Sequence, residues 1–435
     1  MTRRRLIACV VLLMMVFGIA TLLEIKSDEK NIADKTNSRL EYKAYVSHAP
    51  IRINSDADFD LQFSNRTISG WIINGTGCGY CIYIGNCSQA FTIKNCSLHN
   101  ASGVDGFFFG NTGLSLYNTS HGFISSNNCS ANHNFGINLT ASNINTLTYN
   151  NGSNNLDEGI SLYYSQNNIL ADNNCSANYR FGIWLNYNSN NNTLNRNVCF
   201  NNNNIGIYIT SSNFNTVLNN ICSKSYWGIG LFASERNKLA YNICGRNSND
   251  GITIQSNYNT INNNTCINNS VCGISLYSTS KNDVKNNICL SNHLYGINIV
   301  SSYSIVTYNN CSANLLYGIF IEGSSKFNRI YHNNFIGNHG AGSVYDPLHV
   351  QANDTTGTNF WNTSTEGNYW SDWTGPDNNH DGIVDSAYIL DGGAGAQDYH
   401  PLANPTVVSE FSPVSIIILS VILITMALAW FRRTR

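Results

Sequence analysis

One loop near the end of the chain has the side-chain spacing of a calcium ligand set. Residues 377–385 read DNNHDGIVD, which places oxygen-bearing side chains at loop positions 1, 3, 5 and 9 and a glycine at position 6. Position 12, where an EF-hand loop has a bidentate glutamate, is Tyr388. The sequence therefore predicts a shortened calcium loop, and the alternative is an ion-free loop of Asx turns. The predicted ligands are Asp377, Asn379, Asp381, Ile383 through its carbonyl group, and Asp385.

Carboxylates that could cleave a sugar chain are sparse in the central region. Glycosidic cleavage requires two carboxyl groups within about 5–10 Å of each other. Asp157 and Glu158 are neighbours in sequence, and Arg180 follows one repeat later, aligned with Asp157. This alignment predicts a surface ion pair that contributes little to stability. These three residues are the best catalytic candidates, although the pattern assembles no complete catalytic site around them.

Cysteines form a regular column, six or seven residues before a repeated glycine. Buried thiols behave as small hydrophobic groups, so we predict that the column fills the core, with disulfide bonds or a metal site as the alternatives. A second group near the N-terminal end matches no zinc module and predicts a disulfide-linked or free-thiol cap. The column consists of Cys129, Cys175, Cys199, Cys222, Cys244, Cys266, Cys289 and Cys311, and the second group of Cys78, Cys81, Cys87 and Cys96.

The elements that position these residues follow from a repeat. Nine Gly-Ile pairs recur at intervals of 22 to 24 residues, a period too short for paired helices and typical of a β-solenoid whose coils share one core. In each G-I-x-(L/I) unit the two aliphatic residues are two apart and point inward, while the middle residue points outward. The glycines are Gly136, Gly159, Gly182, Gly206, Gly228, Gly251, Gly273, Gly296 and Gly318.

Two more columns share this period. An aliphatic column marks a second short strand, and the cysteines mark a third. Asparagines two residues before each cysteine position predict a ladder of side-chain hydrogen bonds, because stacked coils lie about 4.8 Å apart. The aliphatic column reads Leu147, Ile169, Leu194, Val217, Leu239, Ile261, Val284, Val306 and Ile330, and the asparagines are Asn127, Asn150, Asn173, Asn197, Asn220, Asn242, Asn264, Asn287 and Asn309.

Three strands per coil predict an all-β fold, a single-stranded parallel β-helix with about 23 residues per coil. Almost no helix is expected between the two ends of the chain. Trp361, Tyr369, Trp370 and Trp373 are expected to cover the last coil. We expect a signal peptide or signal anchor in residues 1–25, a lead-in and cap in 26–77, the β-helix in 78–340, a C-terminal cap with the calcium loop in 341–404, and a transmembrane anchor or sorting signal in 405–435.

Composition and the two ends predict an exported protein. Charged residues make up 11% of the chain and the net charge is −2, which excludes the basic patch of a nucleic-acid-binding protein. Arginines precede an apolar run over 6–23, and a second apolar run over 416–431 ends in arginines, so we expect N-terminal and C-terminal membrane segments and an extracellular solenoid. Glycosylation sequons stand at Asn65, Asn74, Asn118, Asn138, Asn353 and Asn362.

Aromatic residues on the outside of the Gly-Ile strands form a candidate sugar-binding surface. Each ring offers an apolar face, and neighbouring asparagine amides offer donors and acceptors. The alternative is that rings next to the glycines only staple neighbouring coils together. The candidate ligand-binding residues are Trp184, Tyr208, Trp227, Tyr295 and Tyr317.

The chain resembles NosD-type right-handed parallel β-helix proteins of archaeal cell surfaces over residues 45–403. The resemblance is carried by the coils, by HAPIRI at 48–53 with WII at 71–73, and by NYWSDW at 368–373 with DYHPL at 398–402. It implies a right-handed coil, and either copper handling, as in NosD, or the carbohydrate binding and cleavage found on the wider fold. The residues argue against copper, because the methionines stand at 1, 14, 15 and 426 and the histidines are scattered.

The expected function is that of an extracellular, membrane-attached recognition or envelope protein that binds carbohydrate. Surface glycans or envelope proteins are the expected partners, and calcium is the expected ion. The alternatives are a polysaccharide lyase or hydrolase on the same fold and a NosD-like copper-handling protein. Nucleic acid is not an expected partner.

Overall fold

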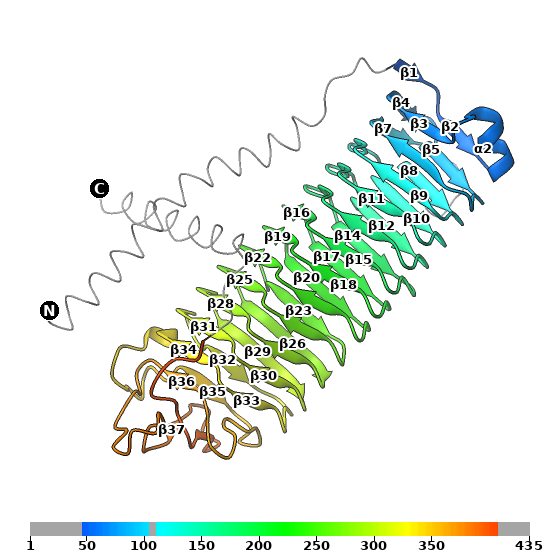
Figure 1. Cartoon of the computed structure of the whole chain (residues 1–435). Helices are drawn as coiled ribbons and strands as arrows, with labels where there is room; N and C mark the ends of the chain where they lie inside the picture. Colours follow the sequence, from blue (N-terminus) through cyan, green and yellow to red (C-terminus); the bar gives the residue numbers. More distant parts are fainter. Residues whose placement is uncertain (1–45, 104–109, 408–435) are drawn as a thin grey trace, which may run out of the picture. The chain divides into compact units, whose positions relative to one another are not determined.

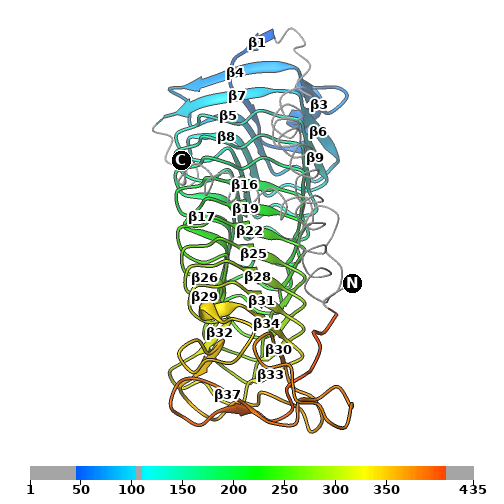
Figure 2. The ribbon, with the colours of Figure 1, turned by 90° about the vertical axis from the view of Figure 1, so that its left-hand side faces the viewer.

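The computed structural model describes residues 46–103 and 110–407, and this part of the chain is a parallel β-helix (Figure 1). The coils contribute strands to three sheets, which run along the solenoid side by side (Figure 2). Neighbouring coils pair in parallel, and Ile137 pairs with Ile160, one coil of 23 residues later. The predicted β-helix and its coil length are therefore confirmed.

Sheet I contains the Gly-Ile strands and has 13 members. Its strands are β2 (Ile51–Ile53), β5 (Tyr80–Gly85), β8 (Thr112–Tyr117), β10 (Ile137–Thr140), β12 (Ile160–Tyr163), β14 (Phe181–Asn186), β17 (Ile205–Thr210), β20 (Trp227–Phe232), β23 (Ile252–Gln255), β26 (Cys272–Ser280), β29 (Tyr295–Ser302), β32 (Ile319–Ile321) and β35 (Ala352–Asp354).

Sheet II contains the aliphatic column and has 12 members. Its strands are β3 (Thr67–Ser69), β6 (Phe91–Lys94), β9 (Gly122–Ser125), β11 (Thr146–Thr148), β13 (Ile169–Ala171), β15 (Thr193–Asn195), β18 (Thr216–Leu218), β21 (Lys238–Ala240), β24 (Thr260–Asn262), β27 (Asp283–Lys285), β30 (Ile305–Thr307) and β33 (Arg329–Tyr331).

Sheet III contains most of the cysteine column in 8 strands, and a separate sheet of 3 strands lies at the N-terminal end. The two are linked by single parallel bridges through Asn128, Asn151 and Asn174. The strands of sheet III are β16 (Val198–Phe200), β19 (Ile221–Ser223), β22 (Ile243–Gly245), β25 (Thr265–Ile267), β28 (Ile288–Leu290), β31 (Asn310–Ser312), β34 (Asn334–Ile336) and β36 (Tyr369–Trp370); the N-terminal strands are β1 (Val46–His48), β4 (Trp71–Thr76) and β7 (Ser97–Ser102).

The inward side chains of the three sheets form one continuous core. The Ile and Leu of the Gly-Ile units are buried, as predicted. One position of the aliphatic column was wrong: Leu170 is buried and pairs with Leu147, whereas Ile169 is 47% exposed. The reason is the alternation of a strand, which turns adjacent residues to opposite faces.

The cysteine column lies in this core as unpaired thiols. Cys266 stacks directly between Cys244 and Cys289 in neighbouring coils. Burial raises the pKa of Cys266 and Cys289 well above the ordinary value of a thiol, so these groups are neutral. The prediction that the column fills the core is confirmed, and the N-terminal cysteines are free thiols too.

The repeated glycines mark the place where successive coils come closest. A Cβ atom added to Gly228 would lie 2.5 Å from the carbonyl oxygen of Gly251, and one added to Gly251 would lie 2.6 Å from that of Gly273. No larger residue fits at these positions without a shift of backbone. Close approach, rather than an unusual φ, therefore explains the glycine of the G-I-x-L unit.

The predicted asparagine ladder is present and fully hydrogen-bonded. Asn197 donates its backbone N–H and its Nδ2 to Oδ1 of Asn220, at 2.9 and 3.0 Å, and Asn220 does the same to Asn242. Nδ2 of Asn220 also donates to the carbonyl of Leu194 in the preceding coil. Each side-chain amide thus satisfies backbone groups of the preceding coil and bonds the asparagine of the next coil. A second ladder, at the corner between sheets III and I, includes Asn247, Asn269, Asn292 and Asn314.

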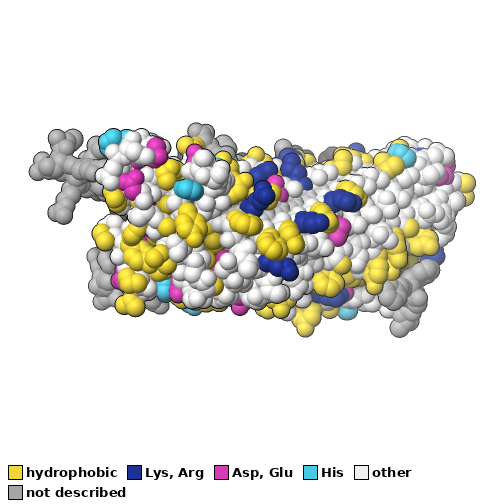
Figure 3. All heavy atoms as spheres, turned by 90° about the horizontal axis from the view of Figure 1, so that it is seen from below, with side chains coloured by type: hydrophobic (Ala, Val, Ile, Leu, Met, Phe, Trp, Pro, Cys, Tyr) yellow, Lys and Arg dark blue, Asp and Glu magenta, His cyan; other side chains and the backbone are white. Residues whose placement is uncertain are grey.

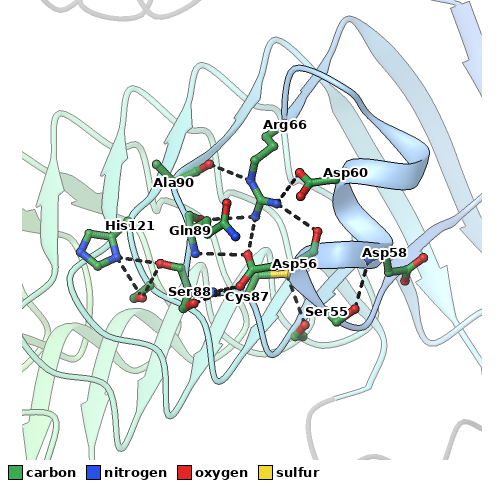
Figure 4. A network of polar contacts seen from close by, with 12 residues as sticks. Ser55, Asp56, Asp58, Asp60, Arg66, Cys87, Ser88, Gln89, Ala90 and His121 are labelled. Carbon is green, nitrogen blue, oxygen red and sulfur yellow. Dashed lines mark hydrogen bonds and ion pairs between the residues drawn. The ribbon is translucent and has the colours of Figure 1, made fainter.

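A short helix closes the N-terminal end of the solenoid. Helix α2 (Asp56–Gln62) begins at Ser55, whose side chain accepts the N–H of Asp58, and it buries Phe59 against the first coils. Arg66 ties this helix to the coils, with contacts of 2.6 Å to Asp56 and 2.7 Å to Asp60 (Figure 4). Parallel pairing already begins at Val46, because strands β1 to β4 stack on later coils, so the solenoid starts before the expected boundary at residue 78.

Aromatic rings close the C-terminal end. Trp370 stacks between Phe335 and Tyr388, at centroid distances of 4.2 and 4.0 Å, and Trp361 is also buried. The carboxylate of Asp398 accepts hydrogen bonds from Nε1 of Trp370 and from the Asn368 backbone. These rings continue the core past the last coil, which confirms the cap predicted for Trp361 and Trp370. Short elements η1 (Asn338–Gly340), β37 (Tyr388–Ile389) and β38 (Gln397–Asp398) complete this region.

The predicted membrane segments at 1–25 and 405–435 lie outside the described residues, apart from 405–407. Within the described part, no helix has the length and apolarity needed to cross a bilayer. Of the predicted glycosylation sites, Asn65, Asn74 and Asn118 are exposed. Asn138 and Asn353 are buried, at 1% and 7% exposure, so the folded chain presents neither to a modifying enzyme.

Candidate functional site

The candidate site lies on the outer face of sheet I. Two columns of side chains build this face, one at the residue before each repeated glycine and one at the middle position of G-I-x-L. The middle position was expected to point to solvent, but the small residues Asn138, Ser161, Thr253 and Ser275 are at most 5% exposed there. The outer face of sheet I is therefore not uniformly open to solvent at this position.

Six residues at the middle of this face form a group that we call the Arg180 cluster. Trp184 and Tyr208 are directly paired on β14 and β17. Phe181 packs beside both rings, at centroid distances of 5.7 and 5.1 Å. The guanidinium of Arg180 lies 4.7 Å from the Phe181 ring and 5.3 Å from that of Trp184. The cluster consists of Asp157, Glu158, Arg180, Phe181, Trp184 and Tyr208.

Polar groups fix the orientation of the Trp184 ring. Its Nε1 donates to Oγ1 of Thr210 at 3.1 Å, and that hydroxyl donates to Oδ1 of Asn186 at 2.7 Å. Thr210 and Asn186 are buried next to a half-buried indole. A ring held in this way offers a preorganised apolar surface with hydrogen-bonding groups at its border, which suits a sugar.

The two carboxyl groups of the cluster have different environments. Nη1 of Arg180 lies 3.6 Å from Asp157 and 3.4 Å from Glu158. The Glu158 side chain is completely buried, whereas that of Asp157 is 27% exposed. Burial, with the neighbouring Asp157 carboxylate, raises the pKa of Glu158 to about 9 against the opposing effect of Arg180. The predicted surface ion pair of Asp157 with Arg180 is present, at 3.6 Å between partly exposed side chains. Glu158 is a buried carboxyl group, and its raised pKa keeps it protonated at neutral pH.

Trp227 extends the aromatic surface to a third consecutive coil. Gly230 separates its ring from that of Tyr208: a Cβ atom at Gly230 would lie 3.2 Å from the Tyr208 ring and 3.3 Å from that of Trp227. The missing side chain at Gly230 lets both rings approach the sheet. Nε1 of Trp227 is buried and has no hydrogen-bond partner among the described residues.

Tyr295 and Tyr317 form a second aromatic group, separated from the first by the coils of β23 and β26. Both rings stack with Phe320, at centroid distances of 4.4 and 5.9 Å. Tyr317 donates to the carboxylate of Asp391 at 2.6 Å, and this bond lowers the pKa of Asp391. These three rings face each other across the coils, so this group fits the stapling alternative better than the first group does.

The structure adds one acidic residue, Asp250, that the sequence did not single out as a candidate. Asp250, in the same column as Glu158, is 6% exposed and binds Thr253 and the Cys272 backbone. Burial raises the pKa of Asp250. A usable signal existed, because Glu158 and Asp250 are acids in a column otherwise occupied by aromatic, aliphatic or cysteine side chains over 135–317.

The predicted calcium ligands lie in an exposed loop and bind the backbone of that loop. The Asp377 carboxylate accepts the N–H groups of Asp381 and Gly382 at 3.2 and 3.1 Å, and Asp385 accepts from Asn378 at 2.9 Å. Over 46–103 and 110–407, no group of three or more His, Cys, Asp or Glu side chains is placed to hold a metal ion. Tyr388, which replaces the glutamate at position 12, packs in the cap instead.

Calcium binding to this loop is a prediction with a direct thermal test. If Asp377, Asn379, Asp381 and Asp385 bind the ion, 5 mM calcium should raise the melting temperature of the full-length protein by about 2–5 °C, because a ligand bound only by the folded state stabilises it. Chelator should reverse the shift, and Asp381→Asn should abolish it. Asp346→Asn is the control, because Asp346 is a half-exposed acid outside this loop. No change on adding chelator would contradict calcium binding.

Comparison with known proteins agrees with the coil geometry. Residues 51–222 match the family described as "Right handed beta helix region", and residues 200–375 match "Periplasmic copper-binding protein (NosD)". The coils and the first match define a right-handed parallel β-helix protein. The second match reaches into the C-terminal cap, and together with the coils it supports a NosD-type right-handed β-helix protein.

Several solved structures have a similar fold, and their likeness to this chain concerns the fold alone. A mutant of the periplasmic alginate epimerase AlgG is 14% identical over 64% of this chain and 83% of its own, with a TM-score of 0.41. The alginate lyase from Paenibacillus sp. str. FPU-7 is 12% identical over 64% and 99%, with a TM-score of 0.41. The A-module of the Azotobacter vinelandii mannuronan C-5 epimerase AlgE6 is 14% identical over 77% and 87%, with a TM-score of 0.36. No curated protein matches the chain.

Proposed function

We propose that this protein is an extracellular, membrane-attached β-helix protein that binds surface carbohydrate through the outer face of sheet I. The observation that carries the proposal is the continuous aromatic surface of Trp184, Tyr208 and Trp227 on three consecutive coils, with Arg180 at its border. Sugar rings stack on such surfaces, while amide, hydroxyl and guanidinium groups bind their hydroxyls. The description of the matched family as periplasmic supports a location outside the cytoplasm.

Removal of one ring tests this proposal. Trp184→Ala in the full-length protein should weaken binding to any glycan found on a glycan array by at least about tenfold, because the indole supplies both stacking area and a fixed position. Phe200→Ala is the matched control, since Phe200 is a 39% exposed ring on a strand of sheet III. Equal loss in both variants, or no array binding by the unmodified protein, would contradict the proposal.

A polysaccharide lyase or hydrolase is a second candidate, supported by one observation. Glu158 holds a proton at neutral pH, which a general acid requires, and Arg180 lies between it and Asp157. If the protein cleaves its glycan, Glu158→Gln should abolish product release while binding on the array persists. Unchanged turnover in this variant would exclude Glu158 from the reaction.

The description of the matched family includes copper binding. Among the described residues, we identify no set of side chains suited to bind copper. The column thiols are buried, and one imidazole pair, His339 and His349, has ring centroids 5.7 Å apart. Copper stoichiometry of the full-length protein would decide this alternative.

A further inference from the structure

A row of exposed aromatic and cationic side chains follows the corner at which sheet I turns into sheet II. We call it the corner file. It has one residue in each of six successive coils, from the β17–β18 corner to the β32–β33 corner. Figure 3 shows Lys and Arg side chains gathered beside hydrophobic ones midway along one face of the solenoid. The corner file consists of Phe214, Arg236, Tyr258, Lys281, Tyr303 and Phe327.

Local structure does not explain these residue types. Every member has a left-handed backbone, with φ between 55° and 59°, a conformation that favours glycine and asparagine. The two coils before the file have Asn167 and Asn191 at the same corner position, with φ of 57° and 56°. The four rings of the file are 42–51% exposed, so they do not fill the core either. Large side chains at strained, exposed positions indicate a role at the surface.

The cations and the rings of the file contact one another. The guanidinium of Arg236 lies 5.6 Å from the Phe214 ring and 5.8 Å from the Tyr258 ring. Nζ of Lys281 lies 5.3 Å from the Tyr258 ring and donates to its hydroxyl at 3.2 Å. Tyr303 and Phe327 pack with centroids 5.4 Å apart. These contacts link the first four members of the file, Phe214 to Lys281, and separately join Tyr303 to Phe327.

A row of polar side chains runs beside the file, one residue earlier in each coil, and includes one acid, Glu235, and one further cation, Lys326. All of them except the exposed Lys326 are half-exposed. Oδ1 of Asn213 accepts the N–H of Glu235 at 2.7 Å, and Oδ1 of Asn257 accepts that of Ser280 at 2.8 Å. Ser302 accepts the N–H of Lys326 in the same way. These bonds fix amides and hydroxyls next to the rings, where they can meet the hydroxyl groups of a ligand.

We propose that the corner file binds an acidic polysaccharide that lies lengthwise along the solenoid. Positive charge repeats two coils apart at Arg236 and Lys281, which suits a polymer with regularly spaced carboxylate or sulfate groups, and the rings between them offer apolar faces for sugars. An added peptide strand is disfavoured, because the backbone N–H groups of Tyr258, Lys281 and Tyr303 already donate to the next coil. This inference concerns a different surface from the Arg180 cluster and does not rest on the function proposed for it.

An anionic membrane would be the other partner for rings and cations together. The fixed polar row argues for a polysaccharide, because lipid acyl chains offer nothing to its amides and hydroxyls, whereas sugars do. The cations also lie close to the rings they contact, so inserting those rings into a bilayer would carry charge with them.

The test measures binding of the full-length protein to polygalacturonate and dextran sulfate, with neutral dextran and phosphatidylglycerol vesicles for comparison. The acidic polymers should bind, more weakly as salt rises, and neutral dextran should not. Arg236→Asn with Lys281→Asn should weaken binding at least tenfold, and Phe214→Asn with Tyr258→Asn should weaken it while salt dependence persists. Asparagine is the matched replacement, since the chain itself has it at this corner, so melting temperatures should not fall.

Lys224→Asn is the control, because Lys224 is an exposed cation with φ of 56° at a different corner. It should leave binding to the acidic polymers unchanged. The proposal is overturned if the unmodified protein binds neither acidic polymer, if it binds vesicles or neutral dextran as well as it binds them, or if the Arg236 and Lys281 variant binds normally.

Discussion

Replacing Asn220 by alanine should lower the free energy of unfolding by about 3–5 kcal/mol, although the side chain is polar and no ligand is involved. Asn220 has 0% exposure and hydrogen-bonds the coils on both sides. Its loss leaves the N–H and Nδ2 of Asn197 and the carbonyl of Leu194 without these partners in the interior. Each buried polar group left unsatisfied costs about 1–3 kcal/mol. Urea denaturation of the full-length protein would measure the difference.

The destabilisation caused by Asn220→Ala should also be confined to the coils around Asn220. A solenoid is stabilised by contacts between nearest coils, so a broken ladder weakens the coils of β16, β19 and β22 before distant ones. Hydrogen exchange should therefore accelerate around Asn220 and remain slow near β5 and β8. Asn203→Ala is the matched control, because Asn203 is an exposed asparagine of a neighbouring corner. Equal destabilisation by the two substitutions would show that the ladder does not carry the stability we assign to it.

The same ladder explains why the architecture was predictable from sequence. A core thiol, an inward aliphatic pair and a corner asparagine each recur once per coil, and like residues stack on like residues. The one misplaced strand residue also had a usable signal. Buried aliphatic residues follow the corner asparagine by two positions. The position of Asn168 therefore predicts that Leu170, rather than Ile169, is buried, as the structure shows.

The candidate site was less predictable, because it depends on departures from the repeat. The rings of Trp184 and Tyr208 were recognised, but their contact with Arg180 and Phe181 depends on how two coils pack. The burial of Glu158 depends on its neighbours in the adjacent coils. The sequence of a single repeat does not show these contacts. The corner file was missed for a related reason. A turn with a left-handed residue is normally recognised from asparagine or glycine, and the aromatic residues at these corners gave no such signal.

A protonated Glu158 should make the protein less stable as the pH rises from about 5 to 9. The pKa of Glu158 is raised from 4.5 to about 9 in the folded state. The folded protein therefore binds one more proton than the unfolded chain within this window, and stability falls by up to about 1.4 kcal/mol per pH unit. The total loss of folding stability is on the order of several kcal/mol. The protein has its full stability at a pH below the unfolded pKa of Glu158, and the loss is complete above about pH 9.

Glu158→Gln should remove this dependence, because the amide has the shape of the protonated acid and no proton to lose. Thermal and urea unfolding at pH 5, 7 and 9 should give similar stability for the two proteins at pH 5 and higher stability for the variant at pH 9. Glu235→Gln is the control for loss of an acidic group on the outside of the coils, where Glu235 is only half buried.

Other buried acids also make stability fall as the pH rises, but they do so at lower pH. The decline between pH 7 and 9 can therefore be assigned to Glu158. Burial raises the pKa of Asp398 to about 6, so its contribution is lost between about pH 4 and 6 and should persist in Glu158→Gln. Arg180→Gln should extend the decline beyond pH 9, since loss of the positive charge that favours the ionised Glu158 raises its pKa further. If Glu158→Gln kept the full decline between pH 7 and 9, Glu158 would be ionised in the folded protein, and both its buried state and its suitability as a general acid would have to be abandoned.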